Sequence, residues 1–586
     1  MEARMSEDES SPAERAADEA RKQIIECIDN RQSFLLEAGA GAGKTYSLIE
    51  ALRHLVQKDG LQLLRRHQQI ACITYTNVAT EEIRSRTDGH RAILSSTIHA
   101  FCWSLIRGFQ PLLRTKLPEL AGWPERLAEV DNLRSRTIEY NLGYPVAKRD
   151  DTRISLGHDD VLQLTVALME QPKFRKLLVA RYPILLIDEY QDTNAAFANS
   201  ITNHLLDHER MLIGFFGDHW QKIYDDGCGK IEHEALRTIN KEANFRSAPI
   251  IVDVLNRMRP ELPQEVSDPH AAGSVAVYHT NSWPGPRRSG INWTGDLWPD
   301  VASKYVDSMF ERLKNDGWSL DPKDTKYLFL THRILAARQG YSNLLTVFPY
   351  ADAVIKKEDP HIAFLVTTVE PMALAYEKRK FGEMFAALGQ EAPQLSGRDA
   401  KLEWTRDLQR LLRLRQTGTI GDVIDYLRQT HRPQVPDNVE ERENELVARG
   451  SESISDENAP INILRRLRGV KYQEIIALAA FINDKTPFAT KHGVKGAEFD
   501  NVLVVFGRGW SKYDFVQFLE RAQSPETVPD DEMEMFERNR NLFYVVCSRP
   551  KKRLAIMFTQ HVSDAAMRTL TDWFGAAAIH ALDVPH

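Results

Sequence analysis

The chain has 586 residues, of which 42% are hydrophobic and 27% are charged, and its formal net charge is −7 with a pI near 6.3. This length exceeds what one hydrophobic core supports and predicts roughly three or four domains. No apolar run approaches the roughly 20 residues of a membrane span, and the acidic balance excludes a globally basic nucleic-acid binder, so any such site must be a local groove.

The first 20 residues are polar and acidic and lack the apolar segment of a secretory signal, so we expect a flexible lead. The five cysteines lie far apart and form no CxxC pair, which argues against a zinc or iron–sulfur site. Reduced thiols in a cytoplasmic protein are the expected state. A helical pattern follows over residues 16–29 and contains Gln23, which by itself suggests only a surface side chain.

A loop of Gly and Ala, residues 38–43, follows the apolar run 34–36 and precedes a helical apolar pattern. Small residues let backbone N–H groups approach an anion, and the start of a helix adds positive partial charge. Lys44 can reach the β- and γ-phosphates of a triphosphate, and the Thr45 hydroxyl can hold Mg²⁺. This order of strand, loop and helix predicts a nucleotide-binding loop rather than an incidental glycine-rich turn.

Polar side chains follow the next apolar strand, residues 70–74, and begin a later helix near residue 98. Tyr75 could stack on a base, while Thr76, Asn77 and His99 suit contacts to a phosphate backbone. Each signal is weak alone, since a core tyrosine and helix caps are the ordinary explanation. Residues 109–180 then show amphipathic helical patterns with breaks at prolines, which predict a helical insertion.

An apolar strand over residues 184–188 ends in Asp188 and Glu189. The first carboxylate can bind Mg²⁺, and the second can orient or deprotonate an attacking water. A third strand, residues 212–217, precedes Gln221, which could sense the γ-phosphate. Arg246 is a permanent cation that suits a phosphate, although its short context NFRS carries little signal alone.

The second half of the chain suggests another α/β unit. A strand over residues 326–334 is followed by a largely helical, charged stretch to about residue 485. Thr490, His492 and Glu498 lie just before a very apolar strand, and Arg549 ends a helix that precedes a closing strand.

Eight ordered segments together resemble the motifs of the UvrD/Rep family of superfamily 1 helicases. They read AGAGAGKT, TYTNVATEEI, STIHAF, IDEYQDTN, GDHWQKIY, NFRS, TKHGVKGAEFDNV and YVVCSRPKKRL. The resemblance extends from residue 23 to about residue 558, and the IDEYQD form is far more specific than a generic acidic strand end. One departure stands out: YDDGCGK replaces the aromatic-Arg-Gly run that stacks a base in this family, which puts the step size in doubt.

The resemblance implies ATP and Mg²⁺ as cofactors and gives roles to particular residues. The predicted nucleotide contacts are Gln23, Ala38, Gly39, Ala40, Gly41, Ala42, Gly43, Lys44, Thr45, Tyr46, Phe245, Gly496 and Glu498. The predicted catalytic residues are Lys44, Asp188, Glu189, Gln221, Arg246 and Arg549, with Thr45 and Asp188 as magnesium ligands. The predicted DNA path comprises Tyr75, Thr76, Asn77, His99, Tyr224, Thr490 and His492.

The resemblance also predicts the fold class: α/β, with two RecA-like P-loop domains of parallel sheets flanked by helices, each with a mostly helical insertion. The expected units are a lead (1–20), domain 1A (21–108 and 181–242), insertion 1B (109–180), domain 2A (243–350 and 486–586) and insertion 2B (351–485).

The predicted activity is ATP-driven 3′→5′ movement on single-stranded DNA and at duplex junctions. Compact forms of this family resemble the helicase subunit of the Gabija anti-phage system, which implies an OLD-like ATPase–nuclease partner. Two alternatives remain: a DNA-sensing regulatory ATPase of a nuclease complex with little unwinding, and a P-loop ATPase that acts on protein or small molecules. The strand-lining residues argue against the second alternative.

Overall fold

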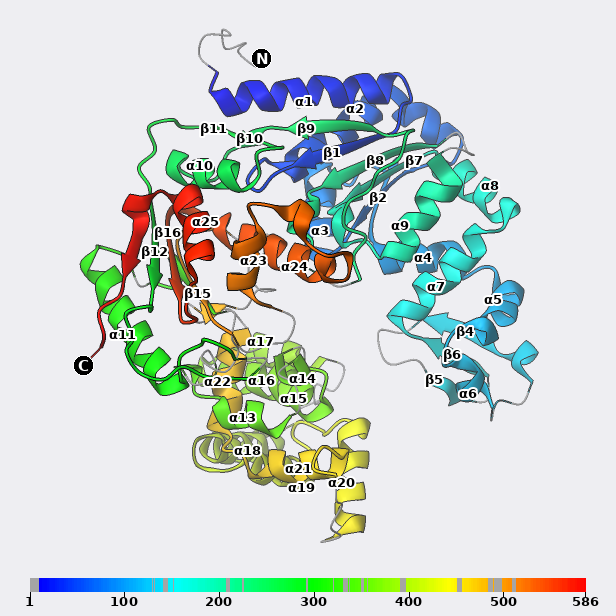
Figure 1. The fold of residues 1–586 in the computed structure, drawn as a ribbon. Helices are drawn as coiled ribbons and strands as arrows, with labels where there is room; N and C mark the ends of the chain where they lie inside the picture. Colours follow the sequence, from blue (N-terminus) through cyan, green and yellow to red (C-terminus); the bar gives the residue numbers. More distant parts are fainter. Residues whose placement is uncertain are drawn as a thin grey trace.

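The computed structural model describes residues 10–585, with internal gaps at 129, 131, 141–145, 151, 207–210, 224–225, 291–292, 320, 330–335, 337, 349–351, 356, 390–396, 451–455, 483–487, 490–497 and 509–512. Two parallel sheets, each covered by helices on both faces, dominate the structure (Figure 1). Among the described residues no helix combines the length and apolarity needed to cross a bilayer.

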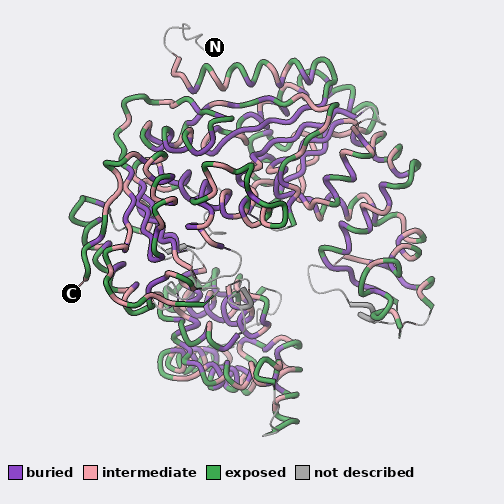
Figure 2. The backbone as a smooth tube through the Cα atoms, viewed as in Figure 1, coloured by how far each residue is buried: buried purple, intermediate pink, exposed green. Residues whose placement is uncertain are grey.

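The first sheet has six parallel strands in the order β3-β2-β7-β8-β1-β9. The strands are β1 (Phe34–Ala38), β2 (Ile70–Thr74), β3 (Ile93–Thr97), β7 (Ile184–Asp188), β8 (Leu212–Gly217) and β9 (Arg237–Lys241). The four inner strands, β2, β7, β8 and β1, are buried along their whole length, and such apolar runs are typical of parallel strands that are covered on both faces. Figure 2 shows these central strands as buried.

Helices on the two faces of this sheet build two separate cores. One face packs against α1 (Pro12–Asp29), α2 (Lys44–Arg65) and α3 (Asn77–Arg86). The other face packs against α4 (Ile98–Ile106), α7 (His158–Met169), α8 (Pro172–Arg181) and α9 (Ala195–Ile201).

The second sheet also has six parallel strands, in the order β14-β13-β15-β16-β12-β17. They are β12 (Ser274–His279), β13 (Thr325–Phe329), β14 (Phe488–Ala489), β15 (Phe499–Phe506), β16 (Pro550–Phe558) and β17 (Ile579–Ala581). One face packs against α10 (Pro249–Met258), α23 (Phe515–Arg521), α24 (Asp530–Cys547) and α25 (Asp564–Phe574). The other face packs against α11 (Pro299–Asn315) and the second insertion. These two sheets confirm the predicted fold class.

Two further groups of elements extend to the same side of the molecule, away from α1 (Figure 1). One lies between α4 and β7 and includes α5 (Gln110–Lys116) and α6 (Trp123–Leu127). The other lies between β13 and β14 and is helical. It comprises α13 (Ser342–Val347), α14 (Asp352–Ile355), α15 (Pro360–Phe364), α16 (Glu370–Glu377), α17 (Phe381–Leu388), α18 (Arg398–Thr417), α19 (Ile420–Thr430), α20 (Asp437–Arg449), α21 (Pro460–Gly469) and α22 (Gln473–Ile482).

The structure corrects two local expectations, while the predicted domain boundaries remain a proposal. Helix α1 begins at Pro12, inside the stretch expected to be a flexible lead, because Ser11 and Glu14 form a capping box at its start. The first insertion is not purely helical: β4 (Thr137–Tyr140), β6 (Arg153–Leu156) and β5 (Val146–Asp150) form a small sheet in that order. Strands this short carry too little periodicity to be recognised in sequence.

The relative placement of the sheets creates one shared edge. Parallel strands bring their carboxyl ends to one side, so β1, β7 and β8 bring together the predicted phosphate loop (residues 38–43), Asp188 and Asp218. The second sheet faces this edge with the amino ends of its strands: Glu498 directly precedes β15 and Arg549 directly precedes β16. Residues from both halves of the chain therefore meet here.

Candidate functional site

The loop after β1 is held in a conformation that only glycine adopts without strain. Gly41 and Gly43 have φ values of 75° and 73°, in the left-handed region. Space is equally restrictive, because a Cβ on Gly41 would lie 2.8 Å from the Cβ of Arg246 and 2.8 Å from Asn244 Oδ1. Helix α2 begins immediately afterwards at Lys44, so the loop presents a helix N-terminus at the shared edge.

Two carboxylates follow β7 at the same edge. Asp188 is buried, and its burial together with the charge of Glu189 raises its pKa to about 7, although Lys44 opposes this shift. Glu189 has a left-handed backbone (φ 49°), and its carboxylate accepts a hydrogen bond from Gln191 Nε2 at 2.6 Å. The charge of Lys44 does not offset the burial of this acid, and a divalent cation held by Asp188 and Thr45 would supply further positive charge.

Gln221 and Arg549 contact one another across the two halves of the chain. Arg549 Nη2 donates to Gln221 Oε1 at 3.3 Å, and Gln221 Nε2 donates to Asp218 Oδ2 at 2.6 Å. Arg549 is 1% exposed, and burial with the neighbouring charge of Arg246 lowers its pKa to about 9. Arg246 itself donates from Nη1 to Ser548 O at 3.0 Å and pairs with Glu498 at 2.9 Å.

Sequence reasoning missed one cation here. Lys241, the last residue of β9, is 2% exposed, and its Nζ donates to Gly43 O at 3.2 Å and to Ser47 Oγ at 2.8 Å. Burial and the charge of Lys44 lower its pKa to about 8. Its position three residues before Asn244 in NFRS was the available signal, but only the pairing of β9 with β1 brings it to the loop.

Lys44, Lys241, Arg246 and Arg549 thus gather around the phosphate loop. Two of these cations have lowered pKa values caused partly by another member of the group. Mutually repelling cations at the start of a helix are typical of a site for a multiply charged anion, which would relieve the repulsion.

Two of the side chains predicted for the base and ribose, Phe245 and Glu498, lie beside this cluster. Phe245 is 44% exposed, and its backbone N–H donates to Gly41 O at 2.9 Å. Tyr46 is exposed on the first turn of α2. Gln23 lies on α1, where its Nε2 donates to Glu19 Oε1 at 3.1 Å. Glu498 is held by Arg246 and by Lys551 Nζ at 3.3 Å, whereas Gly496 lies outside the described residues.

The predicted DNA path is described only in part. Tyr75, Thr76 and Asn77 are exposed where β2 leads into α3, and the Thr76 hydroxyl accepts the N–H of Ala79, as a helix cap does. His99 begins α4 with its ring 4.7 Å from that of His158, and burial with the charge of His158 lowers its pKa. Tyr224, Thr490 and His492 lie outside the described residues.

The chain is similar to a known family model and to several curated proteins. A family model described as an AAA domain matches residues 21–226. The Gabija protein GajB of Bacillus cereus is 25% identical over 685 aligned residues, which cover 92% of this chain and 95% of that protein.

Bacterial helicases match over a shorter part of the chain. ATP-dependent DNA helicase UvrD1 of Mycobacterium tuberculosis is 26% identical over 42% of this chain and 40% of its own length. ATP-dependent DNA helicase Rep of Escherichia coli is 26% identical over 40% of this chain and 42% of its own length. The chain is therefore similar to a Gabija GajB protein along almost its whole length and to UvrD/Rep-type helicases within it, as its motifs predict.

Proposed function

We propose that the protein is an ATP hydrolase that moves 3′→5′ on single-stranded DNA as a superfamily 1A helicase. The main support for this proposal is a cluster of four cations around the phosphate loop: Lys44, Lys241, Arg246 and Arg549. Two carboxylates, Asp188 and Glu189, lie beside this cluster. The names of the similar proteins, ATP-dependent DNA helicases UvrD1 and Rep, support DNA as the polymer on which ATP hydrolysis acts.

In this proposal each residue has a role that follows from its place. The loop N–H groups and Lys44 hold the phosphates, and Phe245 stacks on the adenine. Mg²⁺, held by Thr45 and Asp188, would neutralise phosphate charge when bound. Glu189 orients the attacking water and accepts its proton, while Gln221, Arg246 and Arg549 contact the γ-phosphate. Because Arg549 lies in the second domain, hydrolysis requires the two domains to be together.

We further propose a cytoplasmic role in anti-phage defence, together with an OLD-like ATPase–nuclease. This rests on the similarity to a Gabija GajB protein along 92% of the chain. A second candidate function, a DNA-sensing regulatory ATPase with little unwinding, is favoured by the sequence YDDGCGK after Ile223, where the base-stacking run of the helicases is replaced.

The first test is steady-state ATP hydrolysis with and without single-stranded DNA, with Glu189→Gln as the inactive control. We expect DNA to increase turnover and the substitution to abolish it, because the water-orienting carboxylate becomes a neutral amide. Duplexes with a 3′ or a 5′ tail then separate the proposals. Unwinding from the 3′ tail alone supports the helicase, whereas DNA-stimulated hydrolysis without unwinding supports the regulatory ATPase. DNA-independent turnover would contradict both.

A further inference from the structure

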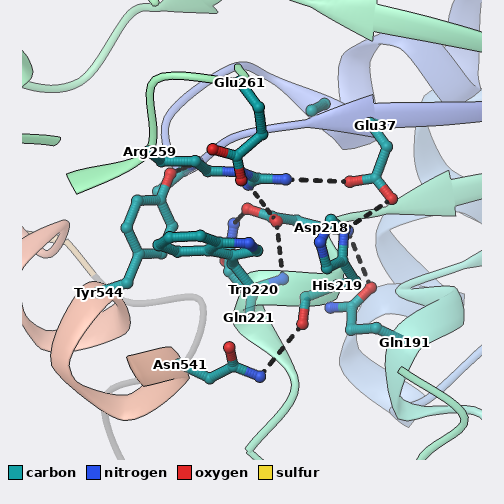
Figure 3. A network of polar contacts seen from close by, with 12 residues as sticks. Glu37, Gln191, Asp218, His219, Trp220, Gln221, Arg259, Glu261, Asn541 and Tyr544 are labelled. Atoms are coloured by element: carbon teal, nitrogen blue, oxygen red, sulfur yellow. Dashed lines mark hydrogen bonds and ion pairs between the residues drawn. The ribbon is translucent and has the colours of Figure 1, made fainter. Parts of the chain in front are cut away.

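A buried arginine that follows a helix of the second sheet contacts residues of the first sheet (Figure 3). Arg259 directly follows α10, whose Ile251, Leu255 and Met258 pack in the core of the second sheet. Its Nη1 donates to Asp218 Oδ1 at 2.6 Å, and its Nη2 approaches Glu37 Oε2 at 3.4 Å. Both acceptors belong to the first sheet: Glu37 lies within β1, and Asp218 directly follows β8.

The surroundings of this guanidinium keep water out and fix its plane. Arg259 is 2% exposed, and its guanidinium carbon lies 5.2 Å from the ring centroid of Trp220 and 5.9 Å from that of Tyr544. Burial by itself raises the pKa of Asp218, but the charges of Arg259 and Lys44 outweigh it and hold that pKa below its ordinary value. Asp218 therefore remains a carboxylate because Arg259 is there.

The same position could be taken for a metal site, since Glu37, Asp218 and His219 bring their ligand atoms within 4.8 Å of one another. The carboxylate oxygens of Glu37 and Asp218 already accept hydrogen bonds from protein groups. Arg259 contacts both carboxylates, the Tyr190 hydroxyl donates to Glu37 Oε1, and His219 Nδ1 lies 3.1 Å from that oxygen. The guanidinium thus supplies the positive charge that a metal ion would otherwise bring.

Asp218 connects this arginine to the γ-phosphate sensor. Its Oδ1 accepts from Arg259, and its Oδ2 accepts from Gln221 Nε2 at 2.6 Å. The second bond turns the amide of Gln221 so that its Oε1 faces Arg549. The chain of contacts Arg259–Asp218–Gln221–Arg549 therefore begins directly after α10 and ends directly before β16, both next to the second sheet, and it passes through residues of the first sheet.

We propose that Arg259 is a positioning residue for ATP hydrolysis, which holds the γ-phosphate sensor Gln221 in place through Asp218. The inference rests on the proposed function and adds to it a residue that none of the sequence motifs contains. Without the guanidinium, Asp218 would be a buried carboxylate lacking its cation, and it would reorient or take up a proton. Gln221 would then lose the acceptor that fixes its amide.

The position of Arg259 also explains how the sensor could respond to domain closure. Asn541 on α24 donates from Nδ2 to His219 O and to Lys222 O, both at 3.2 Å. The second domain therefore contacts both ends of the short segment 219–222, which contains Gln221. If the domains separate, Arg259 and Asn541 leave together. Gln221 is then held in its working orientation only while the domains are in contact.

The test compares Arg259→Met and Arg259→Lys with Arg257→Met. Arg257 lies two residues earlier on α10 and is exposed, and its Nη1 donates to the backbone O of Trp573 at 3.1 Å. We expect Arg259→Met to lower kcat by roughly 100-fold with a much smaller change in KM, because a misplaced sensor affects chemistry more than binding. Arg259→Lys should recover part of kcat, because an ammonium can pair with Asp218 but cannot bridge to Glu37.

A double-mutant cycle with Gln221→Ala distinguishes positioning from general destabilisation. Once the sensor is absent, Arg259→Met should lower kcat little further, because both changes remove the same function. Equal kcat for Arg259→Met and Arg257→Met, or the same fold-loss with and without Gln221, would overturn the inference. Should Arg259→Met fail to fold by circular dichroism, the cycle is run with Arg259→Lys. A wild type without ATP hydrolysis would instead overturn the proposed function.

Discussion

At the scale of single residues, the site is notable for a lysine that is buried against the phosphate loop. Lys241 Nζ lies 2.8 Å from Ser47 Oγ and 3.2 Å from Gly43 O, and Phe245 lies beside it with its ring centroid 6.0 Å away. These contacts tie the end of β9 to the first turn of α2. The lysine holds the loop in place and adds to its positive charge. In the absence of an anion, this buried charge lowers the free energy of unfolding.

Lys241→Met should change the pH dependence of stability. The folded pKa of about 8 lies below the ordinary value of 10.5, so the unfolded chain binds more protons between these values. Wild-type Lys241 therefore penalises folding fully at pH 7, and the penalty disappears as the pH rises above 10. We expect the Tm difference, variant minus wild type, to increase as the pH falls from 9.5 to 7 in the absence of nucleotide.

Differential scanning fluorimetry at several pH values measures this difference. Lys22→Met provides the control, because Lys22 is exposed on α1. A Tm difference that stays constant with pH would contradict the assignment of a lowered pKa to Lys241. The same variant should raise the KM for ATP, since one of the four cations around the loop is lost.

At the scale of secondary-structure elements, the helical insertion between β13 and β14 is joined by buried ion pairs as well as apolar contacts. Arg415 on α18 binds Glu370 on α16 through two bonds, Nε to Oε1 at 2.7 Å and Nη2 to Oε2 at 2.6 Å. The side chains are only 3% and 7% exposed. Such a bidentate pair fixes the relative rotation of two helices more strictly than apolar packing does.

Arg415→Ala should loosen this insertion. Removal of one partner leaves the Glu370 carboxylate buried without its cation, at a cost of about 3 kcal/mol. We expect faster limited proteolysis within residues 342–482, while Arg413→Ala, an exposed position on the same helix, should digest like the wild type. Identical digestion of the two variants would show that the pair contributes little to the stability of the insertion.

At the scale of the whole molecule, the site depends on contacts between residues that lie at least 252 positions apart. Arg549 meets Gln221, Arg246 meets Glu498, and Tyr544 lies 3.5 Å from the N–H of Ala40 in the phosphate loop. Neither sheet by itself carries all of the predicted catalytic residues. In the proposed function, assembly of the site across two domains is what would couple ATP hydrolysis to movement.

Arg549→Ala should separate binding from hydrolysis. The first domain retains the phosphate loop and Lys44, so we expect ATP affinity to fall only slightly. DNA-stimulated kcat should fall about 1000-fold, because the cation that stabilises the transition state is lost. Lys552→Ala is the control, since Lys552 is exposed and pairs with Asp500 at 2.6 Å. Loss of affinity equal to the loss of kcat would contradict a role limited to hydrolysis.

The sequence by itself determined the fold class, and it predicts the phosphate loop from a short segment. Glycines at positions 41 and 43 and the acidic pair after an apolar strand are local requirements of phosphate chemistry, so they are readable in short segments. The start of α1 was also encoded locally, in the capping box of Ser11 and Glu14, although the acidic composition suggested a flexible lead.

Only the tertiary structure decided where Lys241 and Arg259 lie. A lysine at the end of one strand and an arginine after one helix are ordinary residues, and no local pattern distinguishes them. Lys241 reaches the phosphate loop because β9 pairs with β1, and Arg259 reaches Asp218 because α10 packs on the second sheet at the shared edge. Both charges affect the site because they are buried beside groups that lie far away in the sequence. Burial is a property of the assembled fold and cannot be read from a short segment.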